Sequence, residues 1–222
     1  MSVNAPVRIA VLASGRGSNL AALLAARDQG LAIDIATVGS DKADAPALAL
    51  AQAAGIPTFA LAPKGFPDRR SYDTELLARV RASGAEWLVL AGFMRVLDGE
   101  AIRPWSGHIL NIHPSLLPKY RGLHTHRRAL EAGDREHGAS VHIVTAELDG
   151  GPVIAQARIA IEPGDDEDTL AARLLVQEHR LLPAVLALLA NGRLAWVDDA
   201  PRLDGTRLAA PLRLGPDGLH QG

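Results

Sequence analysis

Short apolar runs alternate with amphipathic segments along the first half of the chain. Runs rich in β-branched residues predict buried strands at residues 7–12, 33–38, 57–61, 87–91 and 108–112. Apolar positions with helical spacing predict helices at residues 20–27, 45–54 and 71–82, the last two ended by Gly55 and Gly84. Because strands that alternate with helices form βαβ units, this half predicts an α/β fold with a mainly parallel sheet.

The pattern changes after Ala129. Residues 139–145 and 153–161 predict two strands, and the loop between them is too short for a helical crossover, so we expect an antiparallel pair. Residues 169–190 predict a long helix whose start follows four acidic residues and which Pro183 kinks or splits. We expect residues 193–197 and 203–208 to form a final hairpin, and residues 209–222 to form a frayed tail.

Composition limits the class of protein. A chain of 222 residues, 48% of them hydrophobic, suits one large domain or two small ones with a sizeable core. The net charge of -2 argues against a general basic surface for nucleic acid. Without cysteine there is no disulfide, thiolate metal site or cysteine nucleophile. No apolar run suits a membrane span and residues 1–6 lack signal-peptide features, so we expect a cytoplasmic protein with no membrane partner.

A glycine-rich turn, SGRGSN at residues 14–19, joins the first predicted strand to the first helix. Glycine lets the backbone approach a ligand closely, and a helix start offers free N–H groups, so a phosphate is a natural ligand. A plain turn capped by Ser18 is an equally good interpretation of the motif alone. Leu20 stands where a dinucleotide fingerprint has its third glycine, and the Gly-Lys-Ser/Thr of a P-loop is absent. The turn therefore indicates a single phosphate rather than a pyrophosphate.

Asn111 and His113 lie two residues apart at the carboxyl end of a predicted strand, in the segment LNIHPSLLP. A period of two points both side chains to the same face, and ligands bind at this end of a parallel sheet. An amide donor beside an imidazole suits an oxygen that gains negative charge during acyl transfer. A lone histidine would favour a structural role, but its occurrence with Asn111, Pro114 and Pro118 favours a site.

The loop LDGGP at residues 148–152 joins the two predicted antiparallel strands. Taken alone, its Asp-Gly pair favours a structural β-turn. A carboxylate from Asp149 near Asn111 and His113 would complete a working site. It would hold a protonated histidine and accept or relay a proton from an attacking amine.

Six of the eight histidines fall within residues 108–142, which raises the question of a metal site. His124 and His126 have a spacing seen in such sites, but no dedicated motif such as H-E-x-x-H is present. We therefore expect no metal, with His126 as a polar residue at a helix start. His137 and His142 are expected to be structural.

A series of motifs runs in a fixed order between about residues 7 and 208. They are SGxGSN (14–19), SDKAD (40–44), AGFMR (91–95), LNIHPSLLP (110–118), GLHTH (122–126), LDGGP (148–152) and QEH (177–179). With these motifs the chain resembles the phosphoribosylglycinamide formyltransferases, the folate-dependent glycinamide ribonucleotide transformylases of the formyltransferase family. The segment 110–118 is shared with other folate formyltransferases, whereas the segments 14–19, 122–126 and 177–179 are typical of the glycinamide ribonucleotide branch.

The resemblance implies a Rossmann-like three-layer α/β fold, with a mainly parallel sheet and an antiparallel strand in its C-terminal half. It implies a single domain, residues 1–222, with a phosphate-binding half at 1–105 and a catalytic and folate-binding half at 106–208. The implied reaction moves the formyl group of 10-formyltetrahydrofolate, a co-substrate, to the amine of glycinamide ribonucleotide. No metal or nucleic acid takes part, and the protein would be a monomer or homodimer.

The resemblance also implies roles for particular residues. Asn111, His113 and Asp149 would be the catalytic group, acting through a tetrahedral oxyanion with no acyl-enzyme. The residues that would bind the ribonucleotide are Gly15, Arg16, Gly17, Ser18, Asn19 and Glu178. The residues that would bind the folate are Arg69, Met94, Arg95, Val96, Leu97, Asn111, Glu147, Leu148 and Asp149.

Two positions complicate the assignment. Arg121 stands where many members of the family have Pro, and methionyl-tRNA formyltransferases often carry Arg there. Because Arg70 follows Arg69 directly, the sequence does not show which of the two arginines would contact the folate tail.

Three alternative functions stay open. A methionyl-tRNA formyltransferase would be expected to carry an additional basic C-terminal domain, and a hydrolase that releases formate an extra N-terminal regulatory domain. A non-catalytic module for a phosphorylated sugar would need the glycine-rich turn, but it would leave Asn111, His113 and Asp149 apart. We expect the transferase.

Overall fold

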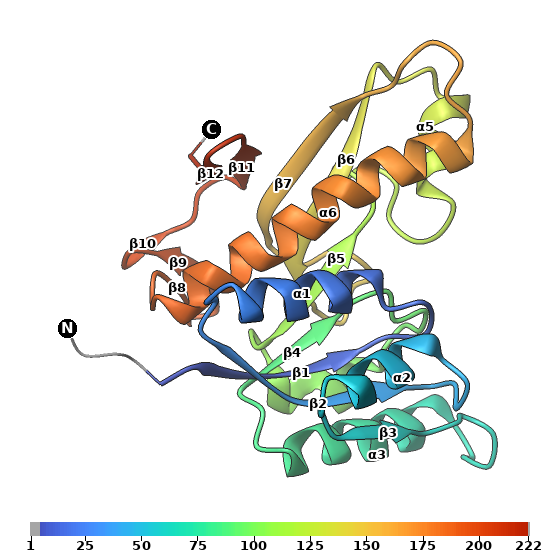
Figure 1. The fold of residues 1–222 in the computed structure, drawn as a ribbon, viewed down its shortest axis with the longest axis vertical. Helices are drawn as coiled ribbons and strands as arrows, with labels where there is room; N and C mark the ends of the chain where they lie inside the picture. Colours follow the sequence, from blue (N-terminus) through green and yellow to red (C-terminus); the bar gives the residue numbers. More distant parts are fainter. Residues whose placement is uncertain (1–4, 222) are drawn as a thin grey trace.

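A mixed β-sheet runs through the molecule (Figure 1). The computed structural model describes residues 5–221, so residues 1–4 of the N-terminal segment and Gly222 of the predicted tail lie outside it. Within that range the nine-stranded sheet has the order β12-β11-β7-β6-β5-β4-β1-β2-β3. Its strands are β1 (Val7–Leu12), β2 (Ile33–Ser40), β3 (Thr58–Ala60), β4 (Trp87–Leu90), β5 (Ile109–His113), β6 (Glu136–Ile143), β7 (Val153–Ala160), β11 (Leu212–Gly215) and β12 (Gly218–His220). Strands β1 to β5 are parallel, and β6 is antiparallel to both β5 and β7, which confirms the predicted α/β sheet.

Helices cover both faces of the sheet and so form three layers with it (Figure 1). One apolar core joins the sheet to α1 (Ser18–Asp28), α2 (Pro46–Ala53) and α6 (Glu167–Ala190). The core of the opposite face includes α3 (Arg69–Ala82), α4 (Gly99–Ile102) and the short 3-10 helix η1 (Arg103–Trp105). A further helix, α5 (Thr125–Glu131), lies against α6. None of these helices, in the part of the chain that the structure describes, is long and apolar enough to cross a membrane.

The order of strands places three loops together at one edge of the sheet. β1 lies between β2 and β4, so the chain runs outward to β3 and then returns to β4 and β5. The carboxyl ends of β1, β4 and β5 are therefore neighbours, and they lead into residues 13–17, 91–98 and 114–124. Ligands bind at such a switch point of an open parallel sheet.

A small three-stranded sheet follows α6 where the sequence predicted a single hairpin. β8 (Leu194–Val197) pairs with β9 (Ala200–Leu203), and β9 also pairs with β10 (Thr206–Arg207). Asp198 and Asp199 make the first turn with φ angles of 51° and 53°. Positive φ at both central residues suits a two-residue hairpin, and Asp tolerates it better than most residues. The predicted pairing of 193–197 with 203–208 is wrong because this turn occurs earlier.

Half of the predicted frayed tail, residues 212–215 and 218–220, forms strands. β11 adds to the main sheet parallel to β7, and β12 folds back against β11. Leu212 is buried, and Leu214 and Leu219 pack against the main core. These apolar contacts and the strand pairing explain why the segment is not frayed.

α6 continues through Pro183, which therefore does not split it. A proline inside a helix removes one hydrogen bond and costs about 3 kcal/mol or more. Leu174 and Leu181 before it and Leu186 after it are fully buried, and each such side chain contributes about 1.5–3 kcal/mol. Packing on both sides of Pro183 thus offsets the cost.

Candidate active site

A cavity of about 700 Å³ opens at the carboxyl edge of the sheet. It lies among the segments that follow β4 and β5 and the loop between β6 and β7, and its size is typical of a small-molecule site. The predicted residues that line it are Met94, Arg95, Val96, Leu97, Asn111, His113, Glu147, Leu148 and Asp149. The structure thus brings together the predicted catalytic group and all of the predicted folate-binding residues except Arg69.

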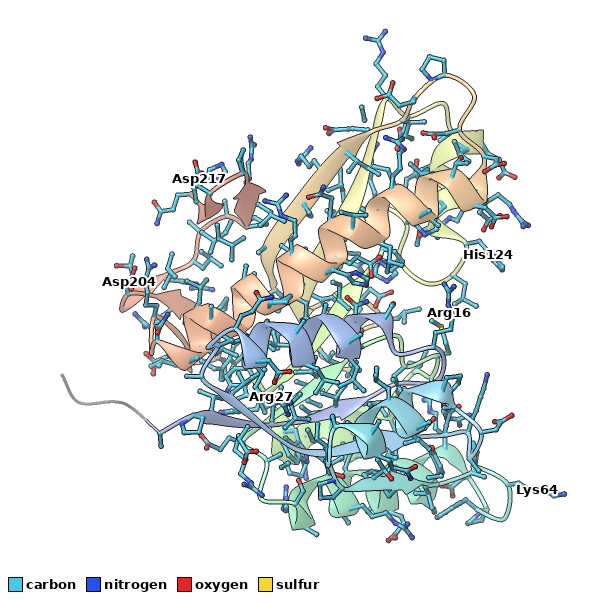
Figure 2. The ribbon with its side chains drawn as sticks, viewed as in Figure 1. Arg16, Arg27, Lys64, His124, Asp204 and Asp217 are labelled. Atoms are coloured by element: carbon cyan, nitrogen blue, oxygen red, sulfur yellow. The ribbon has the colours of Figure 1, made fainter. Side chains whose placement is uncertain are left out.

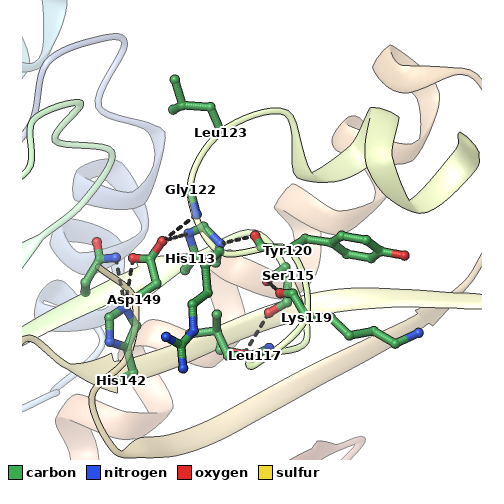
Figure 3. Close-up of polar contacts among 12 residues, drawn as sticks. His113, Ser115, Leu117, Lys119, Tyr120, Gly122, Leu123, His142 and Asp149 are labelled. Carbon is green, nitrogen blue, oxygen red and sulfur yellow. Dashed lines mark hydrogen bonds and ion pairs between the residues drawn. The ribbon is translucent and has the colours of Figure 1, made fainter. Parts of the chain in front are cut away.

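Asn111 and His113 lie on one face of β5, as the alternation predicted. Leu110 and Ile112 between and beside them enter the core on the opposite face. His113 is buried and Asn111 is half-buried. The Nε2–H of His113 donates to the Tyr120 carbonyl at 3.0 Å, which leaves Nδ1 facing Asp149 (Figure 3).

Asp149 lies in the turn between β6 and β7 and points between two histidines (Figure 3). Its φ of 46° belongs to the left-handed region, which aspartate tolerates in tight turns. One carboxylate oxygen accepts the N–H of Gly122 at 2.8 Å and lies 3.5 Å from Nδ1 of His113. The other oxygen lies 3.6 Å from Nε2 of His142. The segment is therefore both the predicted turn and a part of the cavity wall.

Burial and charge oppose each other in this cluster. Burial raises the pKa of Asp149, but its contact with the His142 ring, the hydrogen bond from the Gly122 N–H and the charge of the nearby imidazoles outweigh it, so the pKa lies below its usual value. Burial lowers the pKa of His113, and the hydrogen bond to Tyr120 and the charge of Asp149 oppose this without overcoming it. Asp149 is thus ionised at neutral pH, and His113 releases its proton more readily than an exposed histidine.

His142, expected from the sequence to be structural, belongs to the same cluster. The antiparallel register of β5 and β6 sets it opposite Asn111. Its Nδ1 lies 2.9 Å from the Ile143 carbonyl, and its Nε2 lies 3.0 Å from Nδ2 of Asn111. With the proton assigned to Nδ1 from this network, Nε2 accepts from Asn111. One amide hydrogen of Asn111 is then held by His142, and the other is available to the cavity.

The glycine-rich turn lies outside the cavity wall, at the start of α1. Gly17 has a φ of 78°, and a Cβ there would lie 2.8 Å from Cβ and 2.9 Å from Cα of Ala47. Both the backbone angle and the contact with α2 therefore require glycine. Gly17 itself occupies the N-cap position, so the interpretation of Ser18 as a capping residue is wrong. Arg16 is exposed on this turn and, in Figure 2, extends on the same side of the molecule as His124.

Asn19 and Glu178, both predicted to bind the ribonucleotide, contact each other. Nδ2 of Asn19 donates to Oε2 of Glu178 at 2.9 Å, which joins α1 to α6. Burial raises the pKa of Glu178, and the hydrogen bond from Asn19 only partly opposes this. Oδ1 of Asn19 is buried and has no partner among residues 5–221. Buried acceptors are normally satisfied, so this atom marks a place where a donor from a ligand is expected.

Arg69 and Arg70 lie at the start of α3, away from the lining of the cavity. Arg69 Nη2 is 3.9 Å and Arg70 Nε 3.2 Å from the carboxylate of Asp98. Both side chains are exposed and share the same partner, so the structure does not choose between them as the folate-tail arginine.

Exposed apolar side chains surround the mouth of the cavity. Met94 and Leu123 are each 69% exposed, and Val96 and Leu148 are also exposed while lining the cavity. Exposed apolar groups gathered in one place mark a binding surface.

The departure from the family pattern, Arg121, forms an ion pair with Glu147 and so connects the loop after β5 to the turn that carries Asp149.

His126 and His137 form a second histidine pair. His126 lies in the first turn of α5, the expected place, and it also lines the cavity. Its Nδ1 is 3.1 Å from Nε2 of His137. Burial lowers the pKa of both residues, that of His137 to about 4 with a further contribution from His126. In the described part of the chain, no three His, Cys, Asp or Glu residues are grouped so that they could hold a metal ion.

Comparison with known proteins identifies the class to which this fold and site belong. A model of the formyl transferase family matches residues 7–186, so the chain belongs to that family. It is 49% identical over 203 residues to phosphoribosylglycinamide formyltransferase of Escherichia coli (strain K12), covering 91% of this chain and 96% of that protein.

Two solved structures agree with this assignment. Phosphoribosylglycinamide formyltransferase from Coxiella burnetii superposes with a TM-score of 0.87 at 48% identity, covering 92% of this chain and 96% of that one. Glycinamide ribonucleotide transformylase 1 from Symbiobacterium toebii gives a TM-score of 0.85 at 40% identity, with 90% and 95% covered. The predicted family and its three-layer fold are confirmed.

Proposed function

We propose that this chain transfers the formyl group of 10-formyltetrahydrofolate to the amine of glycinamide ribonucleotide in purine biosynthesis. The observation that carries the proposal is the convergence of Asn111, His113 and Asp149 on one cavity at the carboxyl edge of the sheet. The family and its named relatives, which match over nearly their whole length, support the choice of donor and acceptor.

The amine attacks the formyl carbon, a carbon–nitrogen bond forms, and the formyl oxygen becomes an oxyanion. The free amide hydrogen of Asn111 and an N–H of His113 donate to that oxygen. In the imidazolium form, Nδ1 of His113 also carries a proton. Nδ1 lies 3.5 Å from Asp149, longer than an ordinary N–H···O bond, so this proton can be shared with a third atom. Negative charge on the oxyanion favours the imidazolium, so His113 holds its proton most firmly when the charge develops.

Asp149 handles the proton that the amine loses. Its lowered pKa keeps the carboxylate ionised and ready to accept that proton. The proton then passes to the folate nitrogen, directly or through water, as the bond between that nitrogen and the formyl carbon breaks. The products are the formylated ribonucleotide and tetrahydrofolate.

The binding roles follow the positions of the remaining residues. The turn from Gly15 to Ser18, with Arg16, would hold the phosphate at the start of α1, and Asn19 and Glu178 would hold the ribose side. Residues 94–97 and 147–149 would hold the folate, with Arg69 or Arg70 near its tail. A cytoplasmic location and a monomeric or homodimeric state belong to the same proposal.

One assay tests the proposal. The protein is incubated with 10-formyltetrahydrofolate, with and without glycinamide ribonucleotide, and the folate absorbance is followed. We expect conversion to tetrahydrofolate that depends on the ribonucleotide. Equal conversion without it, with release of formate, would replace the transferase by a hydrolase, and no conversion in either case would leave a non-catalytic binding module.

A further inference from the structure

Residues 93–98 belong to the irregular segment between β4 and α4, and five of them, Phe93 to Leu97, line the cavity. The backbone N–H and C=O groups of Arg95, Val96 and Leu97 form no hydrogen bond with other described residues. Unpaired backbone groups next to a cavity are donors and acceptors for a ligand. How well these backbone groups can bind a ligand depends on how firmly the segment is held in place.

Ser14 holds one end of this segment. Its hydroxyl oxygen accepts the N–H of Met94 at 2.9 Å, and its own N–H donates to the Gly92 carbonyl at 3.1 Å. Ser14 is only 3% exposed and follows β1, so it is fixed by the sheet rather than by the segment.

Asp73 on α3 holds the other end. It is fully buried, and its Oδ2 accepts the N–H of Asp98 at 2.7 Å. Its Oδ1 and the buried Nε of Arg95 both lack a partner among the described residues, while the Arg95 guanidinium lies 4.8 Å over the Tyr72 ring. A buried carboxylate is costly to keep unless its oxygens accept hydrogen bonds. Its presence here serves a backbone group of the segment.

We propose that Ser14 and Asp73 are positioning residues for folate recognition. Each fixes one end of the segment 93–98, and together they set the spacing and direction of the unpaired backbone groups at residues 95–97. A planar heterocycle that carries hydrogen-bond donors and acceptors along one edge would be recognised by such a row of groups. Neither side chain lines the cavity, so both act through the backbone. This inference rests on the proposed function and adds to it the residues that support the folate pocket.

The test measures the dissociation constant of tetrahydrofolate, under argon, by fluorescence titration. The proteins are the wild type, Ser14→Ala, Asp73→Ala, Asp73→Asn and the control Val80→Ala. Losing one buried backbone hydrogen bond weakens binding by about 10-fold, so we expect that change in Ser14→Ala and Asp73→Ala. Asp73→Asn keeps an acceptor oxygen and should bind nearly as the wild type. Val80 is buried on α3 two turns from Asp73, and its truncation should lower stability without changing folate affinity.

Affinity for glycinamide ribonucleotide, measured by calorimetry on the same proteins, should not change. Wild-type affinity for tetrahydrofolate in both alanine variants would overturn the inference, as would equal weakening in Val80→Ala. Asp73→Asn as weak as Asp73→Ala would show that the hydrogen-bond acceptor is not what matters. If Asp73→Ala does not fold, Ser14→Ala still decides. Failure of the wild type itself to bind tetrahydrofolate would instead overturn the proposed function.

Discussion

Nδ1 of His113 lies 3.5 Å from Oδ2 of Asp149, and the two side chains are only 7% and 9% exposed. One comes from the end of β5 and the other from the turn after β6, so strand pairing sets their distance. In a buried place each group favours the charged form of the other. We therefore expect the two residues to act as one unit on the chemical step.

Replacing either member of this pair should lower turnover greatly and substrate affinity little. Loss of positioned proton transfer costs about 10²–10⁴ in rate, and loss of an oxyanion donor about 10²–10³. Residues that act together lose less in combination than the product of their single losses. Steady-state kinetics of His113→Ala, Asp149→Ala and the double variant should show a double variant little worse than the poorer single. Fully multiplicative losses would mean that the residues act separately.

Asp149→Asn should lower the pKa of His113 further. Burial already lowers that pKa, and Asp149 is a nearby charge that opposes the shift. Removing the charge leaves burial with less opposition, so the imidazole should lose its proton at lower pH. NMR titration of the His113 ring in both proteins measures this. An unchanged pKa would show that Asp149 does not affect the protonation of His113, and it would exclude the proposed role of Asp149 in keeping His113 charged.

Gly17→Val should mainly weaken binding of the phosphorylated substrate. A side chain at position 17 would contact the backbone of Ala47 and occupy a positive φ that β-branched residues avoid, so the turn must move. Calorimetry on the folded variant should show weaker ribonucleotide binding and nearly unchanged folate binding, since residue 17 lies outside the cavity wall. Ribonucleotide affinity equal to that of the wild type would show that the phosphate does not bind at this turn.

Local patterns in the sequence predict much of the fold and part of the site. The period of a strand places Asn111 and His113 on one face, and the alternation of strands and helices places them at a ligand-binding edge. The position of His142 has no local signal, because it depends on the register between β5 and β6. A long-range pairing of this kind is not visible in a window of a few residues, so the sequence alone does not predict that His142 lies beside Asn111.

The errors in the C-terminal part have a similar cause. Asp198 and Asp199 form a two-residue turn without the glycine that most such turns carry, so the turn has only a weak signal in the sequence. Residues 212–215 are too few and too close to glycine to predict a strand alone, and they form one because β7 offers an open edge. For Pro183, burial of the flanking leucines outweighs the local preference.

Histidine burial should make the protein less stable in acid. The pKa of His137 falls from 6.5 to about 4 in the folded protein, chiefly through burial and then through His126. As the pH falls below about 6.5 the unfolded chain binds a proton that the folded protein does not bind until about pH 4. Stability is therefore fully present above 6.5 and decreases across this window, by up to about 1.4 kcal/mol per pH unit for one proton.

Urea unfolding at pH 7, 6 and 5 measures this decrease, with His137→Gln as the test and His220→Gln as the control. Glutamine keeps a polar side chain but does not titrate, so the free energy of unfolding of His137→Gln should depend less steeply on pH. Part of the slope should persist, because burial also lowers the pKa of His126. His220 is exposed on β12, and its replacement should leave the wild-type slope. A His137→Gln variant with the full wild-type slope would assign the acid sensitivity to other groups.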